Sequence, residues 1–149
     1  MIAWKYINKT DATGSAIRDY NAMRSIINIT PDEIKEVYEK MTAPRSPNLS
    51  GMPSSHDPMA SQDKLAAQID KLDLLRERYS QAIAYMNWFE PAFSSLTDTE
   101  KTVIREFYMG DSQRSGATYR LMDILHCSES SVERIRSKAF SRLRSLLFG

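Results

Sequence analysis

Apolar residues recur at steps of three and four along most of the chain, and this helical period predicts an all-α protein. In the last third, Ser128 can cap a helix because its hydroxyl can accept a bond from a free amide of the first turn. Glu129 then lies favourably against the positive end of the helix dipole. One apolar stripe follows, formed by Val132, Ile135, Ala139, Leu143 and Leu146.

The side of this helix opposite the apolar stripe is polar and basic. Ser130, Arg134, Ser137 and Ser141 project there, Lys138 lies close to them, and Arg136 flanks the stripe. From Arg134 to Arg144 there are five Lys or Arg and no Asp or Glu. Such a face suits phosphate neutralisation, although basic residues at a helix C-terminus also offset its dipole and are often only solvated.

A shorter helix precedes the basic one. Its apolar side is formed by Leu121, Leu125 and Ile124, and it ends at His126-Cys127. Upstream of it, Thr97 and Glu100 match a Thr-x-x-Glu capping box before another helix. The buried face of that helix is expected to contain Val103, Ile104, Phe107 and Tyr108. Two helices joined by a tight turn, the second basic outside, predict a DNA-binding helix-turn-helix.

The C-terminal third resembles region four of bacterial sigma factors, the part that binds the promoter −35 element. The resemblance rests on Leu96-Thr97-x-x-Glu100, Tyr108-x-Gly110 and Ser128-x-x-x-Val132-x-x-Ile135-x-x-x-Ala139-x-x-x-Leu143-Arg144. His126 stands where that family has a turn glycine, and His can adopt the left-handed conformation at modest cost. Glu133 replaces a family arginine, so the −35 sequence preference does not carry over.

The resemblance implies which positions contact the major groove: Glu129, Ser130, Ser131, Glu133 and Arg134. We expect Arg134, Ser130 and Ser131 to approach base edges. Arg136, Lys138, Arg142 and Arg144 are expected mainly to contact phosphates. The complete set of expected DNA-binding residues is Ser128, Glu129, Ser130, Ser131, Glu133, Arg134, Arg136, Ser137, Lys138, Arg142 and Arg144.

The N-terminal part predicts two helices and a long loop. The first helix spans about 14–28, with Ile17, Tyr20, Met23 and Ile27 on one face. The second starts with Thr30 as cap and Pro31 at the first helical position, and its apolar side is Ile34, Val37, Tyr38 and Met41. A Pro/Ser-rich loop follows over 42–60, because its prolines and glycine exclude a continuous helix.

A long helix is expected from 61 to about 89. The apolar positions Leu65, Ile69, Leu72, Leu75, Tyr79, Ile83, Met86 and Phe89 persist for over three heptads. This spacing predicts coiled-coil-like packing, either on the N-terminal helices or on a second subunit. Glu90-Pro91 should kink or end the helix. We therefore expect an N-terminal packing or self-association region over 1–94 and a DNA-binding domain over 95–149.

The net charge of +1 hides an asymmetry. Residues 1–94 contain eleven basic and twelve acidic residues, whereas 95–149 contain nine basic and seven acidic ones. The C-terminal part is therefore the one expected to meet nucleic acid. A single cysteine excludes an intramolecular disulfide, and no apolar run is long enough for a signal peptide or a membrane span. The sequence predicts a cytoplasmic protein without membrane contact.

The order of elements resembles the ArpU-type phage late transcriptional regulators. The order is short helices, the loop Ser46-Pro47-x-Leu49-x-Gly51-Met52-Pro53 with Asp57, a long heptad-like helix, and a sigma-like helix-turn-helix. With the loop included, this similarity extends over most of the chain. It implies a phage- or prophage-encoded DNA-binding regulator that activates late genes, here expected to act with host RNA polymerase.

Catalytic and cofactor functions are not expected. Ser54-Ser55-His56-Asp57 contains hydrolase-type residues, but adjacent side chains do not face one another as a triad requires. His126-Cys127 lacks further ligands for a metal, and Cys127 is expected to be a small buried residue in the turn. Two alternatives to a transcription regulator remain: a phage DNA-packaging protein of the small-terminase kind, and a helical protein-interaction module. The operator, the sign of regulation, the oligomeric state and the role of the 42–60 loop are open.

Overall fold

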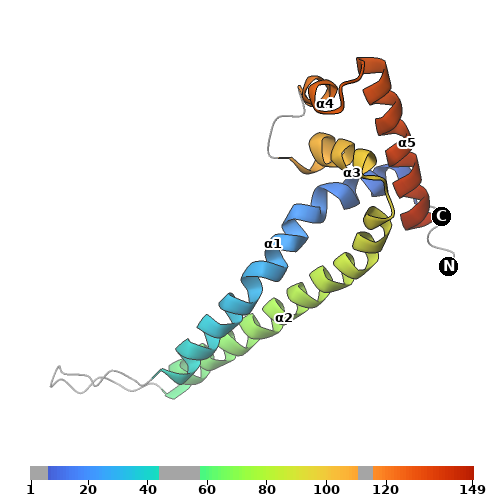
Figure 1. The fold of residues 1–149 in the computed structure, drawn as a ribbon. Helices are drawn as coiled ribbons and strands as arrows, with labels where there is room; N and C mark the ends of the chain where they lie inside the picture. The colour runs from blue at the N-terminus through green and yellow to red at the C-terminus, as the bar shows by residue number, and fades with distance from the viewer. Residues whose placement is uncertain (1–6, 44–57, 111–115) are drawn as a thin grey trace. The chain divides into compact units, whose positions relative to one another are not determined.

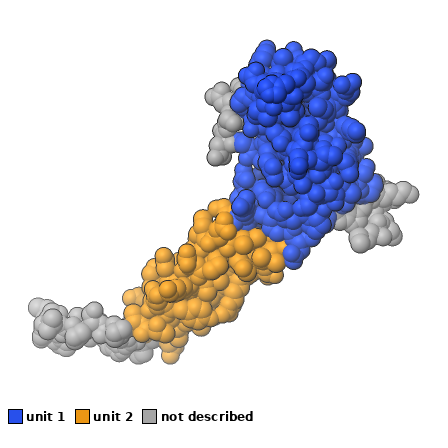
Figure 2. Space-filling view, in the orientation of Figure 1, with its two compact units in different colours: residues 1–24, 84–149 blue, residues 25–83 orange. Residues whose placement is uncertain are grey.

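A computed structural model describes residues 7–43, 58–110 and 116–149, and within them the protein is all-α, as the sequence predicts. The elements are α1 (Lys9–Thr42), α2 (Pro58–Ser94), α3 (Asp98–Ile104), the π-helix η2 (Arg105–Met109), α4 (Ala117–Leu125) and α5 (Glu129–Phe148). Figure 1 shows their order along the chain. The chain divides into two compact units, residues 1–24 with 84–149 and residues 25–83, which Figure 2 colours separately.

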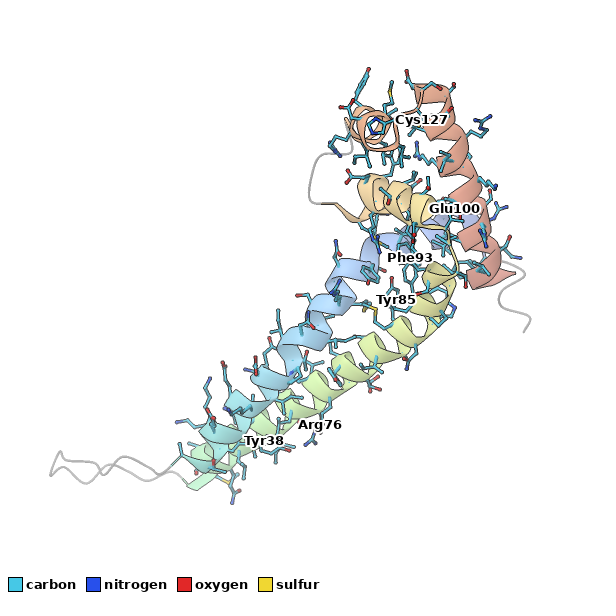
Figure 3. All side chains as sticks on the ribbon, in the orientation of Figure 1. Tyr38, Arg76, Tyr85, Phe93, Glu100 and Cys127 are labelled. Atoms are coloured by element: carbon cyan, nitrogen blue, oxygen red, sulfur yellow. The ribbon has the colours of Figure 1, made fainter. Side chains whose placement is uncertain are left out.

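The first unit contains the helix-turn-helix together with the first turns of α1 and the last turns of α2. The expected division into a packing or self-association region over 1–94 and a DNA-binding domain over 95–149 stays a prediction. One core cluster joins Ile17 of α1 and Phe89 of α2 to Ala139 and Leu143 of α5, all with no exposed surface. A ladder of rings runs through it, with Phe89 5.4 Å from Tyr85 and 5.8 Å from Phe93 between ring centroids. Figure 3 labels Tyr85 and Phe93.

A second cluster in this unit holds the helix-turn-helix together. Val103 and Phe107 from α3 and η2, Leu121 from α4 and Val132 from α5 are all buried in it. The expected capping box at the start of α3 is confirmed, because the Thr97 hydroxyl accepts a bond from the Glu100 amide and the Glu100 carboxylate accepts one from the Thr97 amide. Val103, Ile104 and Phe107 are buried as predicted, and Tyr108 is partly exposed.

The second unit is built from the later turns of α1 and the earlier turns of α2. Val37, Leu72 and Leu75 form its buried cluster, with Ile34 and Met41 against it. The Arg76 guanidinium lies over the Tyr38 ring at 5.9 Å, a pair labelled in Figure 3. Leu65 and Ile69 of the heptad pattern stay 48% and 45% exposed. Because Leu72 and Leu75 are buried with Val37, the long helix packs on α1 in this unit. Its pairing with a second subunit stays a prediction.

The expected break between two N-terminal helices is wrong. The helix α1 runs through Pro31 without interruption to Thr42. Thr30, expected as a cap, is instead buried, and its hydroxyl accepts a bond from Arg78 at 3.4 Å, while Arg78 also pairs with Glu33. A proline inside a helix costs about 3 kcal/mol. The contacts of Thr30, Glu33 and Val37 with α2 offset that cost.

Of the two outcomes expected at Glu90-Pro91, a kink or an end of the helix, the end is wrong, because α2 continues through Pro91 to Ser94. Pro91 is exposed, whereas Ala92 and Phe93 are buried in the first core cluster. Burial of these two side chains favours another helical turn after the proline. The segments 44–57 and 111–115 lie outside the described residues, and so does most of the predicted loop over 42–60. The Ser54-Ser55-His56-Asp57 group lies there as well.

Candidate nucleic-acid interface

The helix-turn-helix predicted from the sequence is formed by α4 and α5. Only residues 126–128 separate the two helices. His126 adopts the left-handed conformation with φ 51° and ψ 46°, as expected from the sequence. Ser128 caps α5, its hydroxyl accepting a bond from the Ser131 amide at 3.3 Å. Cys127, labelled in Figure 3, is partly buried against the second core cluster.

The buried side of α5 agrees with the predicted stripe except at its C-terminal end. Val132, Ala139 and Leu143 have no exposed surface, and Ile135 is partly buried. Leu146, expected in the stripe, is 47% exposed, and Leu147 is buried in its place. A helix can continue a stripe by three or by four residues. The longer step takes Leu147 into the cluster of Ile17 and Phe89, which only the tertiary structure reveals.

The opposite side of α5 is exposed, as predicted. Exposed side chains on its first ten residues are Glu129, Ser130, Glu133, Arg134, Ser137 and Lys138, and Ser131 is partly buried. Ser128 is also exposed, and its hydroxyl lies 3.1 Å from that of Ser130. The residues expected to approach base edges, Ser130, Ser131 and Arg134, therefore lie together on the first turns of α5.

The five basic residues of α5 fall into two groups. Arg142 donates to Glu100 at 3.2 Å, Arg144 donates to the Thr10 hydroxyl at 3.3 Å, and Arg136 contacts Tyr108 and Glu133. Arg134 and Lys138 are exposed and make no hydrogen bond or ion pair with any other described residue. Phosphate binding by Arg136, Arg142 and Arg144 stays a prediction, and it would compete with these internal contacts. Arg134 and Lys138 have no such contact among the described residues to give up.

Glu100 connects the helix-turn-helix to the turn before α3. Its side chain is only 6% exposed, and its carboxylate accepts bonds from the Thr97 amide and from Arg142 of α5. Figure 3 shows Glu100 on α3. A buried carboxylate requires such partners because its charge is costly to remove from water. The sequence predicted the capping role of Glu100 but not its contact with Arg142, which lies 42 positions away.

The sequence also missed the contacts that η2 makes with both helices of the motif. Glu106 accepts a bond from Arg120 of α4 at 3.0 Å, and Phe107 and Tyr108 contact Arg136 of α5. The Met109 carbonyl accepts a bond from the Asn21 side chain of α1. A π-turn shifts the register of the side chains that follow, so a regular 3.6-residue period does not reveal these contacts.

Across 7–43, 58–110 and 116–149, no three His, Cys, Asp or Glu side chains gather as a metal site would require. Within the same ranges, no helix has the length and apolarity needed to cross a bilayer. No protein-family profile, curated protein or solved structure matches the chain.

Proposed function

We propose that this protein is a sequence-specific DNA-binding transcription regulator that inserts the first turns of α5 into the major groove of duplex DNA. The observation that carries the proposal is the capped N-terminal half of α5, which exposes Ser130, Arg134 and Lys138 while Val132 is buried beneath them. A recognition helix needs this arrangement, because its polar face must reach base edges while its apolar face stays in the core.

Two cations of this face, Arg134 and Lys138, have no hydrogen-bond or ion-pair partner among the described residues, which supports a role for the face in contacting a polyanion. Arg134 lies on the same turns of α5 as Ser130 and Ser131, at a position from which its guanidinium can bind the two acceptor atoms of a guanine base. Lys138 lies one turn further along α5, where a phosphate contact is the simpler assignment. Glu129 and Glu133 on the same exposed side would repel phosphates, so they favour a specific approach over a general electrostatic one.

The resemblance to ArpU-type regulators extends the proposal to a phage or prophage late-gene activator. Such a protein would act with host RNA polymerase in the cytoplasm of a bacterial cell. Self-association through α2 would then place two recognition helices on two half-sites. No cofactor, metal or catalytic residue has a part in this function.

Selection from a random duplex library tests the proposal. The wild-type chain should enrich one discrete sequence, and Arg134→Ala should lose about 1–3 kcal/mol of binding free energy at a single base position. Lys71→Ala provides the matched control, because Lys71 is an exposed cation of α2 outside the helix-turn-helix unit. Enrichment of no sequence, or equal losses in both variants, would refute the assignment.

Three further measurements separate the alternatives. A mass consistent with a ring of many subunits would favour a DNA-packaging protein, and the absence of duplex binding at physiological salt would favour a protein-interaction module. Run-off transcription from the selected sequence, with and without the protein, distinguishes activation from both.

A further inference from the structure

Arg136 differs from the other cations of α5 in its surroundings. Its side chain is 23% exposed, half the value of 46% for Arg142. The guanidinium carbon lies 4.4 Å from the ring centroid of Phe107 and 5.6 Å from that of Tyr108. A cation over two rings is attracted by their π faces, and more strongly where water is excluded.

Hydrogen bonds fix the guanidinium in this position. Its Nε donates to the Tyr108 hydroxyl at 3.2 Å, and its Nη1 lies 3.4 Å from a Glu133 carboxylate oxygen. Tyr108 belongs to η2, whereas Glu133 lies one turn earlier on α5. The guanidinium therefore connects the first turns of the proposed recognition helix to a different element of the fold.

The element it contacts is itself tied to the rest of the motif. Phe107 is buried in the cluster that contains Leu121 of α4 and Val132 of α5. Its neighbour Glu106 is ion-paired with Arg120 of α4 at 3.0 Å. One turn of η2 thus contacts α4 through Glu106 and α5 through Phe107 and Tyr108.

We propose that Arg136 is a positioning residue, which sets the orientation of α5 against η2, and not a phosphate contact. This inference rests on the proposed DNA-binding function, and it assigns Arg136 a role in sequence preference. A shift of α5 on η2 would displace Ser130 and Arg134 together, because both project from the same turns. Base contacts depend on that placement far more than a general attraction to phosphates does.

The chemistry of the contact makes lysine a discriminating substitution. A guanidinium can stack on an aromatic face while its edge donates hydrogen bonds, whereas an ammonium is a compact, strongly hydrated charge. Arg136→Lys keeps the charge that a phosphate would need. It loses the combination of ring contact and hydrogen bond that holds α5 on η2.

The binding test compares Arg136→Ala, Arg136→Lys and Tyr108→Phe, with Lys71→Ala as the control, at a temperature where circular dichroism shows all four folded. The probes are a duplex selected by the wild-type chain and a scrambled duplex of equal length. Both Arg136 variants should lower the ratio of selected to scrambled affinity by about tenfold, with an unchanged slope of log affinity against log salt. Tyr108→Phe should lower the ratio by about threefold, because it removes one hydroxyl alone.

Two results in this assay would overturn the inference. A slope reduced by about one unit in Arg136→Ala and restored in Arg136→Lys would make Arg136 a phosphate contact. An unchanged ratio in both Arg136 variants would show that it has no part in sequence preference. If Arg136→Ala does not fold, a lowered ratio in both Arg136→Lys and Tyr108→Phe still supports the inference, and an unchanged ratio in Arg136→Lys still overturns it.

A second assay needs no DNA and remains informative if the wild-type chain binds no duplex. Amide hydrogen exchange over residues 129–138 should be about tenfold faster in the free Arg136→Lys protein than in the wild type, because the first turns of α5 have lost a tether. Lys138→Ala should leave exchange there unchanged. Absence of duplex binding with faster exchange would refute the proposed function alone, and unchanged exchange would refute the positioning role.

Discussion

Replacing Glu100 by alanine should destabilise the unit that contains the helix-turn-helix, although Glu100 lies outside α4 and α5. The substitution removes the half of the capping box that accepts a bond from the Thr97 amide at 3.1 Å, worth about 1 kcal/mol. It also removes the 3.2 Å contact to Arg142, which we set at about 1 kcal/mol because the Arg142 side chain is 46% exposed and can be rehydrated. The expected total is about 2 kcal/mol.

A loss of this size should lower the melting temperature by about 6 °C for a protein of this length, which differential scanning calorimetry resolves. Arg142→Ala should lower it by a similar amount, since that change leaves the Glu100 carboxylate buried with one partner fewer. The double variant should lose less than the sum of the two single losses. A melting temperature within about 1 °C of wild type in Glu100→Ala, or additive losses, would refute the reasoning.

The other predictions concern phosphate contacts, the apolar stripe of α5 and the ionisation of tyrosine. Lys138→Ala should reduce the salt slope of duplex binding by about one unit without altering sequence preference, measured by fluorescence anisotropy at several salt concentrations. Leu147→Ala should cost about 2 kcal/mol in chemical denaturation and Leu146→Ala under about 0.5 kcal/mol, so equal costs would contradict the burial pattern. Burial first, and then the hydrogen bond to Glu90, raises the pKa of Tyr20, and burial raises the pKa of Tyr85. Because its folded-state pKa is above the unfolded value, each tyrosine contributes stability that is present below about pH 10 and is lost as the pH rises further. An unchanged midpoint of chemical denaturation between pH 9 and 11 would contradict this prediction.

Features fixed by nearby residues were predictable from the sequence. The Ser128 cap, the Thr97 capping box and the left-handed His126 each depend on contacts within four residues, so their residue types and spacing suffice. The burial of Val132, Ala139 and Leu143 also follows from the period of one helix. These local features define the helix-turn-helix and the exposed side of α5.

Features decided by distant partners were not predictable. Pro31 suggested the start of a new helix and Pro91 a kink or an end, but contacts with other helices carry α1 and α2 through both prolines. Nothing in the period of α5 chooses Leu147 over Leu146. The internal partners of three cations lie 28, 42 and 134 positions away, at Tyr108, Glu100 and Thr10. The sequence therefore predicts which residues are basic, but not which of them are free to bind.

The exposed side of α5 depends on two separate clusters on its buried side. Val132 anchors the first turns to Leu121 and Phe107, whereas Leu143 and Leu147 anchor the last turns to Ile17 and Phe89. The helix is therefore already formed and held at both ends in the free protein. Binding does not have to offset a loss of conformational entropy on ordering it. Because Arg134 and Lys138 project between these anchors, substitutions in either cluster should change the proposed duplex binding through the placement of α5, without removing any group that is proposed to contact DNA.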